Sequence, residues 1–284
     1  MVRLSRIGIA SLGVIALFAL LAGAGCSKAT QTKLEPKIAP PAIKEAGILR
    51  AGVDLGYPPF AGADNGKQVG LDIDVASALA DQLGLTLSLV DVKPSDAATA
   101  LADGKVDAVF SVPFSEAGLA NTSLAGSYVT DAPVFFVGTD STASVEPSLT
   151  IDALRTQKIA VQEGSAAYWK LASEVGTGTL VVFPTLREAV TAADARDADV
   201  VAGDALVIGY IVRDFPNVHF AGQLEPAVPL GVGVLPDNAD LSTAIRGALD
   251  ALAADRVLDA IRTKWVDGLP KLAAAVSVDQ SATP

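Results

Sequence analysis

The sequence predicts an α/β protein with two lobes, each a largely parallel sheet flanked by helices. Strand-like runs alternate with alanine-rich helical stretches along the chain, and this order is typical of parallel sheets covered by helices. The order helix, polar turn, short strand, polar residue also occurs twice, over residues 96–111 and 186–204. This repeat indicates two lobes of similar construction.

Each expected element follows from its local pattern. Short apolar runs predict strands at 48–53, 85–90, 106–111, 158–162, 180–183, 200–202 and 231–235. Alanine-rich stretches predict helices at 75–83, 95–102, 186–193, 205–212 and 240–264. An apolar run at 134–137 ends the first unit and the chain returns at 230–235, so we expect two crossings that form a hinge.

The N-terminus has the pattern of an export signal. Arg3 and Arg6 precede an uncharged apolar run at 7–21, and small residues lead from there to the single cysteine, Cys26. This order predicts a signal peptide over residues 1–25. A transmembrane anchor is the alternative, but the run is short and interrupted by glycine and serine. A small-residue run before cysteine resembles a lipobox, so we expect acylated Cys26 to hold the protein on the extracytoplasmic face of the membrane, although Gly23 stands where leucine is usual.

Composition limits the classes of partner. The 284-residue chain has a net charge of -11 and no cluster of Lys and Arg, which argues against nucleic acid as a partner. A single cysteine excludes a disulfide within the chain. The polar, proline-containing stretch 26–46 predicts a tether, and 268–284 predicts a flexible tail. The remainder is long enough for two cores, and we expect a monomer.

Residues 52–75 predict a ligand cleft. The expected strand at 48–53 runs into Pro58-Pro59, whose fixed φ holds Tyr57 and Phe60 in a stiff turn. Asp64-Asn65-Gly66 suits a hairpin tip, because these residues tolerate positive φ. Acidic residues then open a helix, as the helix dipole favours.

The same stretch carries a resemblance. Gly70–Val75 reads GLDIDV, and it is followed in order by ALADGKVDAVFS at 100–111, IAVQEGS at 159–165, LGVGV at 230–234 and Lys264-Trp265. Together these motifs resemble the family 3 bacterial extracellular solute-binding proteins, the amino-acid-binding receptors of ABC importers. The resemblance covers residues 47–267. It implies the type II periplasmic-binding-protein fold, with lobe one at 47–136 plus 230–267 and lobe two at 137–229, solute capture by lobe closure, and an ABC transporter permease as partner.

The resemblance also implies ligand contacts. Asp54 would accept hydrogen bonds from the solute, and Tyr57 would stack on it, although packing near the hinge is the alternative for Tyr57. Gly164-Ser165-Ala166 matches the family's turn that binds a solute carboxylate, but by sequence alone it is an ordinary helix N-cap. Asp204 matches the acid that pairs with the solute ammonium, and a carboxylate after a buried strand needs such a partner.

The expected strands and helices also indicate roles for five further polar or aromatic residues. Ser111 should lie on the cleft edge of its strand, and Phe114 should offer a π face to a ligand. Asp72 and Asp74 are expected to be helix-start charges outside the site. His219 stands alone between apolar residues and is expected to be structural.

Three positions depart from the family pattern. The arginine that binds the solute carboxylate should fall at Leu119, and the chain has no arginine between Arg50 and Arg155. Polar contacts expected at positions 112 and 114 are Val112 and Phe114, and a second stacking aromatic is replaced by Pro94. The pocket should therefore be less polar than is usual in the family.

These departures bear on the ligand class. Two acids flanked by aromatic rings suit an amine, a quaternary ammonium compound or an amino-acid derivative with a masked carboxylate. The alternative is an ordinary amino-acid receptor whose carboxylate anchor comes from Lys93 or Lys170.

A binding protein is the leading interpretation of the sequence. An enzyme resembling the cyclohexadienyl dehydratases of the same scaffold is the first alternative, and an extracytoplasmic sensor that docks a membrane protein is the second. The chain offers no metal-binding cluster, no nucleophile near its single histidine and no cofactor motif, so we expect no catalytic residues, metal or cofactor.

Overall fold

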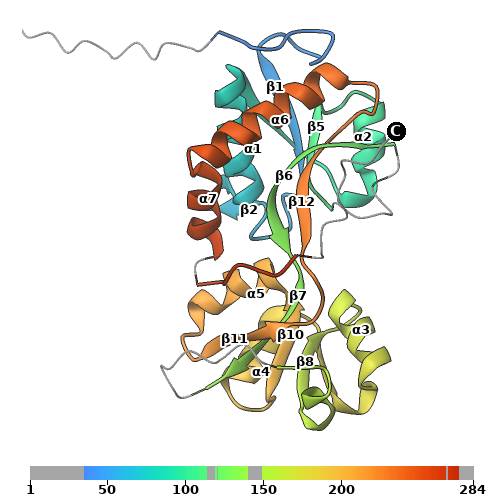
Figure 1. The fold of residues 1–284 in the computed structure, drawn as a ribbon, viewed down its shortest axis with the longest axis vertical. Coiled ribbons are helices and arrows are strands. Elements are labelled where there is room, and N and C mark those ends of the chain that lie inside the picture. Colours follow the sequence, from blue (N-terminus) through green and yellow to red (C-terminus); the bar gives the residue numbers. More distant parts are fainter. Residues whose placement is uncertain (1–34, 114–118, 120, 140–148, 267, 275–284) are drawn as a thin grey trace, which may run out of the picture. The chain divides into compact units, whose positions relative to one another are not determined.

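A computed structural model describes residues 35–113, 119, 121–139, 149–266 and 268–274, and they fold around two five-stranded sheets (Figure 1). The first sheet has the order β4-β1-β5-β12-β6. Its strands are β4 (Thr86–Asp91), β1 (Ile48–Val53), β5 (Ala108–Pro113), β12 (Val228–Val234) and β6 (Ser123–Asp131). Strand β1 runs parallel to both β4 and β5, whereas β12 runs antiparallel to both β5 and β6.

The second sheet has the order β11-β7-β10-β8-β9. Its strands are β11 (Val218–Gln223), β7 (Pro133–Gly138), β10 (Val200–Asp204), β8 (Ile159–Gln162) and β9 (Leu180–Phe183). Strand β8 is parallel to β9 and β10, and β7 is antiparallel to β10 and β11. The sheets are therefore mixed rather than largely parallel. The strands beside the crossings, β6, β7 and β12, run against their neighbours because the chain passes directly from one sheet to the other.

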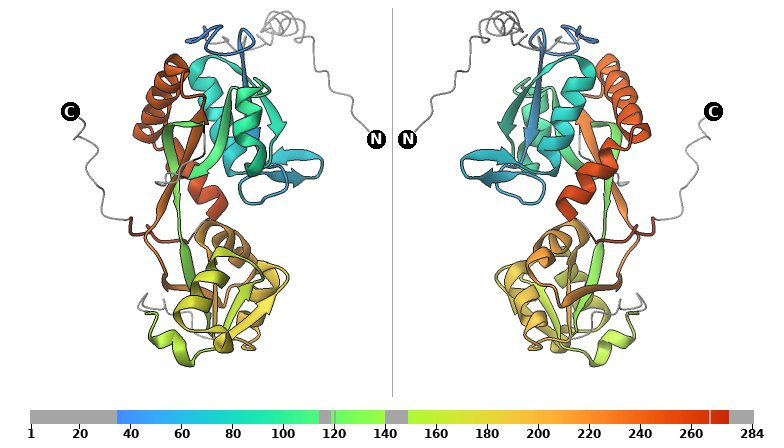
Figure 2. Two further views of the ribbon diagram at one scale, coloured as in Figure 1. Left: turned by 90° about the vertical axis from the view of Figure 1, so that its right-hand side faces the viewer. Right: turned by 90° about the vertical axis from the view of Figure 1, so that its left-hand side faces the viewer.

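Helices cover both sheets. Around the first sheet, α1 (Leu71–Leu83), α6 (Ala239–Ala254) and α7 (Val257–Val266) pack on one another, and α2 (Ala97–Ala102) packs on β5 (Figure 2). The second sheet carries α3 (Ala166–Glu174), α4 (Leu186–Asp194) and α5 (Ala205–Ile211). The helix expected at 240–264 is two helices, because Arg256 between them has a left-handed φ of 59°. Among the described helices, none is long and apolar enough to cross a membrane.

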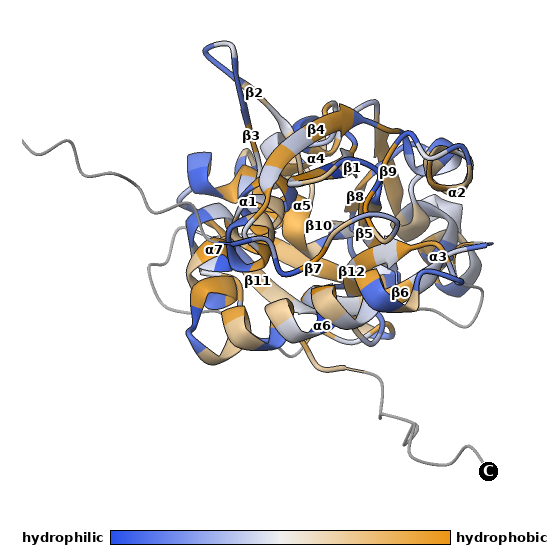
Figure 3. Cartoon of the chain, turned by 90° about the horizontal axis from the view of Figure 1, so that it is seen from above, coloured by the Kyte–Doolittle hydropathy of each residue, from blue (hydrophilic) through white to orange (hydrophobic). Residues whose placement is uncertain are grey.

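The short elements complete the chain. Strands β2 (Gly62–Asp64) and β3 (Lys67–Val69) form a hairpin with the expected positive φ at Asn65 and Gly66, and its outer end is hydrophilic (Figure 3). Single 3₁₀ turns occur at η1 (Pro94–Asp96), η2 (Ala153–Thr156), η3 (Thr177–Thr179) and η4 (Val212–Asp214).

The chain leaves the first sheet at Ala132, earlier than the boundary expected at residue 136. Strand β7 lies entirely in the second sheet, where Val134 pairs with Gly203 and Phe136 pairs with Val201. The side chains of Val134 and Phe136 are buried there. The apolar run that the sequence assigns to the end of lobe one therefore completes the second sheet.

The described part of the predicted tether packs on the first sheet. Ile43 is fully buried, the backbone N–H of Lys44 donates to Asp107 at 2.9 Å, and the Asn238 amide donates to the Ala42 carbonyl at 2.8 Å. The prediction of a free tether is therefore wrong for this segment. The apolar contact of Ile43 with the core is the physical reason.

The segment after α7 is likewise fixed as far as residue 274. Leu269 and Leu272 are buried, and the backbone of Ala273 exchanges hydrogen bonds with the side chain of Gln223. The prediction of a flexible tail from residue 268 is therefore wrong for residues 268–274. Burial of these two leucines, with the hydrogen bonds to Gln223, holds the segment on the fold.

Candidate ligand-binding site

A cavity of ≈ 220 Å³ lies at the carboxyl ends of β1 and β5. This is the edge at which α/β sheets commonly bind ligands. Its lining is Gly52, Val53, Asp54, Tyr57, Phe60, Asp72, Val92, Pro94, Ala97, Val109, Phe110, Ser111, Val112, Pro113, Leu119, Asp131 and Leu230. Three of the sequence-predicted contacts, Asp54, Tyr57 and Ser111, therefore meet at one cavity.

Tyr57 stands at the mouth of this cavity. Its ring lies parallel to that of Phe60, with centroids 5.5 Å apart, and its side chain remains 44% exposed while Phe60 is buried. Burial, followed by the charges of Asp204 and Asp131, raises the pKa of Tyr57 to about 12. The phenol is therefore a neutral hydrogen-bond donor with one ring face supported by Phe60.

Asp54 already has partners. Its carboxylate forms an ion pair with Lys93 and accepts a hydrogen bond from the backbone N–H of Gly56 at 3.0 Å. The hydrogen bond that Lys93 donates to Asp54 raises the pKa of Lys93. A solute that binds Asp54 has to share it with Lys93.

Asp72 lies in the first turn of α1, as the sequence predicts, but it also lines the cavity, so its exclusion from the site is wrong. Its side chain is 2% exposed, and it accepts hydrogen bonds from the hydroxyls of Tyr128 at 2.6 Å and Ser111 at 2.8 Å. Burial raises the pKa of Asp72 to about 7, against the opposing effect of the two hydrogen bonds. The sequence could not reveal this, because the two partners lie far along the chain on β5 and β6.

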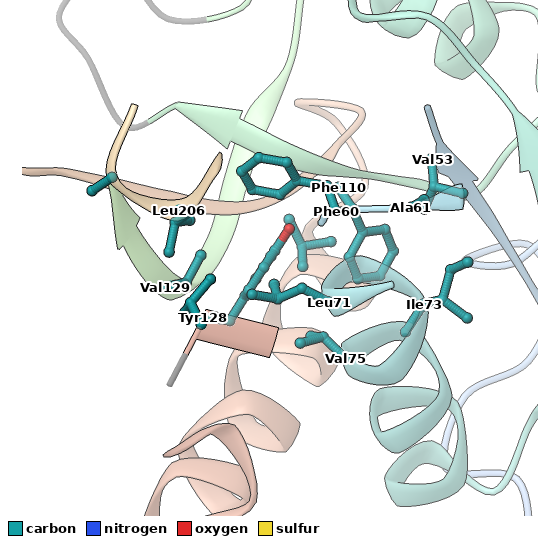
Figure 4. Packing of buried hydrophobic residues seen from close by; sticks show 14 of the residues in the cluster. Val53, Phe60, Ala61, Leu71, Ile73, Val75, Phe110, Tyr128, Val129 and Leu206 are labelled. Carbon is teal, nitrogen blue, oxygen red and sulfur yellow. The ribbon is translucent and has the colours of Figure 1, made fainter. Parts of the chain in front are cut away.

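Ser111 is held in an unusual backbone conformation by this network. Its φ is 55°, and its backbone N–H donates to the Tyr128 hydroxyl at 2.7 Å. Positive φ is uncommon for residues other than glycine and is frequent at ligand sites. Figure 4 shows Tyr128 close to Phe110 and Phe60 near the start of α1, so Tyr128 packs behind the two phenylalanines that line the cavity.

Asp131 is a cavity residue that sequence reasoning missed. Its Oδ1 accepts hydrogen bonds from the backbone N–H groups of Ala132 at 2.9 Å and Leu206 at 3.1 Å. Burial, and then the charge of Asp204, raises the pKa of Asp131 to about 7. A signal was available, since Asp131 lies two residues before Pro133, which marks a strand end, and a carboxylate at the end of a strand is a candidate ligand contact.

Asp204 ends β10 and stands at the N-cap of α5, but its side chain makes no capping hydrogen bond. Burial raises the pKa of Asp204, and a hydrogen bond from Tyr57 opposes this effect. Asp204 is therefore not in the cavity lining but next to it, close enough to interact with both Tyr57 and Asp131.

The predicted carboxylate turn, Gly164-Ser165-Ala166, lies outside the cavity lining. Gly164 has a φ of +67°, and the Ser165 hydroxyl accepts a hydrogen bond from the backbone N–H of Tyr168 at 3.1 Å. This is the ordinary N-cap of α3. The structure therefore does not bring this turn together with Asp54, Tyr57 and Ser111.

Three apolar residues line the cavity at positions where the family pattern has polar, charged or aromatic contacts. Val112, Leu119 and Pro94 all line the cavity, whereas Phe114 falls outside the described residues. Lys170 is not in the lining and pairs with Glu174 and Glu225.

His219 lies on β11 of the second sheet and lines no part of this cavity. In the described part of the chain, no group of three or more His, Cys, Asp or Glu residues could hold a metal ion.

Comparison with known proteins assigns the fold to a family. The sequence matches the bacterial extracellular solute-binding proteins, family 3, over residues 49–268. The chain belongs to this family. It is a solute-binding protein with the type II periplasmic-binding-protein fold.

Two curated relatives come from Escherichia coli (strain K12). A putative ABC transporter arginine-binding protein 2 is 24% identical over 226 residues, which is 78% of this chain and 91% of the relative. The L-cystine-binding protein TcyJ is 23% identical over 266 residues, which is 93% of this chain and 97% of the relative.

Solved structures give the same fold. An ancestral cationic amino acid solute-binding protein (AncCDT-1) has a TM-score of 0.69 at 25% identity, covering 78% of this chain and 96% of the ancestral one. Another structure of AncCDT-1, described as a precursor of cyclohexadienyl dehydratase, has a TM-score of 0.58 at 25% identity. The relatives named above are binding proteins, and one of them is described as the precursor of an enzyme.

The buried acid Asp72 makes stability depend on pH. Its folded-state pKa lies above the ordinary value, so between about pH 4 and pH 7 the folded protein binds a proton that the unfolded chain has lost. This contribution to the free energy of unfolding therefore falls as pH rises through that window. Asp72→Asn keeps an acceptor for the Tyr128 hydroxyl and presents an N–H group to Ser111 Oγ, which would accept instead of donate. We therefore expect the variant to gain a few kcal/mol of stability relative to the parent as the pH rises from 4.5 to 7.5.

Urea unfolding at a series of pH values measures this difference. Asp81→Asn, on the exposed side of the same helix, is the matched control and should follow the parent at every pH. An Asp72→Asn curve parallel to that of the parent would show that Asp72 is ionised throughout.

Proposed function

We propose that this protein is an extracytoplasmic receptor that captures a small amine-bearing solute, an amino acid or an amine-like derivative, and delivers it to an ABC importer. The observation that carries the proposal is the pair of acids near Tyr57: Asp131 in the cavity lining, and Asp204 next to the cavity, where it accepts a hydrogen bond from Tyr57. Carboxylates in a partly buried site bind an ammonium group through charge-assisted hydrogen bonds. Two curated relatives named as binding proteins for arginine and cystine support this class of solute.

Capture by closure of two lobes fits the connectivity. The first sheet supplies Asp54, Tyr57 and Ser111, and the second sheet supplies Asp204 and the turn at 164–166. We assign lobe one to residues 47–131 plus 228–267 and lobe two to the segment between, because strands change sheet at those points. Hinge bending at the crossings would bring the α3 turn toward a bound solute.

Delivery to a permease is proposed from the relatives, two of which are named as ABC transporter arginine-binding proteins. A sensor that docks another membrane protein and an enzyme on the same scaffold remain the alternatives. If the protein is a transport receptor, deletion of its gene should abolish uptake of the solute. If it is a sensor, the deletion should change the transcriptional response and leave uptake intact.

Membrane attachment is proposed to depend on acylation of Cys26, which lies outside the described residues. A diacylglycerol group supplies two hydrocarbon chains, enough for stable anchoring. Cys26→Ser should therefore move the protein from the membrane fraction to the soluble fraction after a carbonate wash. A variant that stays in the membrane with residues 1–25 uncleaved would identify this segment as a transmembrane anchor.

Asp204 gives the sharpest test of solute capture. Asp204→Asn removes the charge but no capping hydrogen bond, so the fold should be unaffected. We expect binding to weaken by roughly 1.5 to 3 kcal/mol, about ten- to a hundredfold. The measurement is calorimetric titration with the solute extracted from the purified protein and identified by mass spectrometry. Asp197→Asn, exposed in the turn before β10, is the control, and equal affinities for the two variants would remove Asp204 from the site.

A further inference from the structure

We propose that Asp131 acts with Asp204 as the binding partner of the solute's cation, and that the cavity selects an amine with an apolar body and no carboxylate. This inference rests on the proposed capture of an amine-bearing solute and narrows it to one chemical class. It also adds a binding residue at the crossing between the two sheets.

Asp131 presents a backbone-anchored carboxylate at the cavity. The backbone N–H groups of Ala132 and Leu206 donate to its Oδ1, and the residue lines the cavity. We expect a bound ammonium group to donate to the side of this carboxylate that faces the cavity. A cation there would meet a carboxylate whose position is already fixed by the backbone, which lowers the entropy lost on binding.

Asp204 is brought to the same place by backbone pairing. Its Cα pairs with that of Pro133 in the β7–β10 ladder, and the N–H of Ala205 donates to the carbonyl of Ala132 at 2.9 Å. The segments around Asp131 and Asp204 are therefore joined directly. The carboxylates lie close enough that the charge of Asp204 contributes to the raised pKa of Asp131.

No protein cation balances these two acids among the described cavity residues. Lys93 pairs with Asp54, and its side chain is 52% exposed. Buried carboxylates close to one another are costly unless a positive charge or a proton is shared between them. A bound ammonium group would supply that charge and donate hydrogen bonds to both.

Among the described lining residues, no Lys or Arg side chain is present to bind an anion. Val92, Val109, Val112 and Leu119 supply aliphatic surface, and Pro94 and Ala97 complete it. A solute carboxylate in this region would lose its hydration without gaining a charged partner. An aliphatic or aromatic group would instead be stabilised by contact with the same surface.

Matched pairs of compounds that differ only in the carboxylate test the ligand class. Phenethylamine with phenylalanine, isopentylamine with leucine, and agmatine with arginine would be titrated into the mature protein at pH 8, where Asp131 is ionised. We expect at least one amine to bind about tenfold or more tightly than its amino acid.

Tighter binding of the amino acid in every pair that binds, or no binding by any amine, would overturn the inference. Either result leaves the receptor proposal to its own test, because that test uses the solute extracted from the protein.

Variants test the role of Asp131. Asp131→Asn keeps an oxygen for the N–H groups of Ala132 and Leu206 but removes the charge, so it should weaken amine binding about tenfold or more without lowering the melting temperature. Asp250→Asn, exposed on α6, is the control and should bind like the parent. Unchanged amine affinity in Asp131→Asn would overturn the assignment.

A second variant tests the apolar wall. Leu119→Arg introduces a guanidinium at a lining position, and we expect it to shift the binding preference toward the amino acid of each pair. An unshifted preference in a folded Leu119→Arg protein would show that the wall does not select against carboxylates.

Discussion

The carboxylate of Asp131 accepts hydrogen bonds from the backbone N–H groups of Ala132 and Leu206 at the point where the chain passes from the first sheet to the second. These bonds join the end of β6 to the first turn of α5. Asp131 accepts a hydrogen bond from a backbone N–H group in the first turn of α5, the role that the N-cap side chain usually has. The side chain of Asp204, at the N-cap, makes no such bond and stays beside the cavity. One interaction thus fixes the crossing and also places two carboxylates together, so the chemistry of the site follows from the way in which the sheets are connected.

The lining of the cavity combines acidic and apolar groups. Tyr57 is a neutral donor whose pKa is raised to about 12, and it lies close to Asp131 and Asp204. Leu119 and Val112 present hydrocarbon to the same cavity. Membership of a family with arginine- and cystine-binding relatives establishes a solute-binding fold but not which groups of the solute are recognised. That selection depends on the residues of this chain, and here they favour a positive charge attached to an apolar body.

The sequence predicted the family, the alternation of strands and helices and the hairpin at Asn65, because these depend on local pattern. It did not predict the burial of Asp72, which arises from long-range contacts with Ser111 and Tyr128. It also placed the change of sheet too late, because an apolar run such as Val134 to Val137 suits either sheet and only strand pairing decides between them. Pairing partners and buried hydrogen bonds across distant segments lie beyond what a local pattern can encode.

A crystal structure of the mature protein with its tightest-binding amine would show whether a cation without a carboxylate binds between Asp131 and Asp204. We expect the ammonium nitrogen to lie within about 3 Å of an oxygen of each carboxylate, with the apolar body of the amine against Leu119. A solute carboxylate seated against Leu119, or held by Lys93 with Asp131 uninvolved, would contradict this expectation.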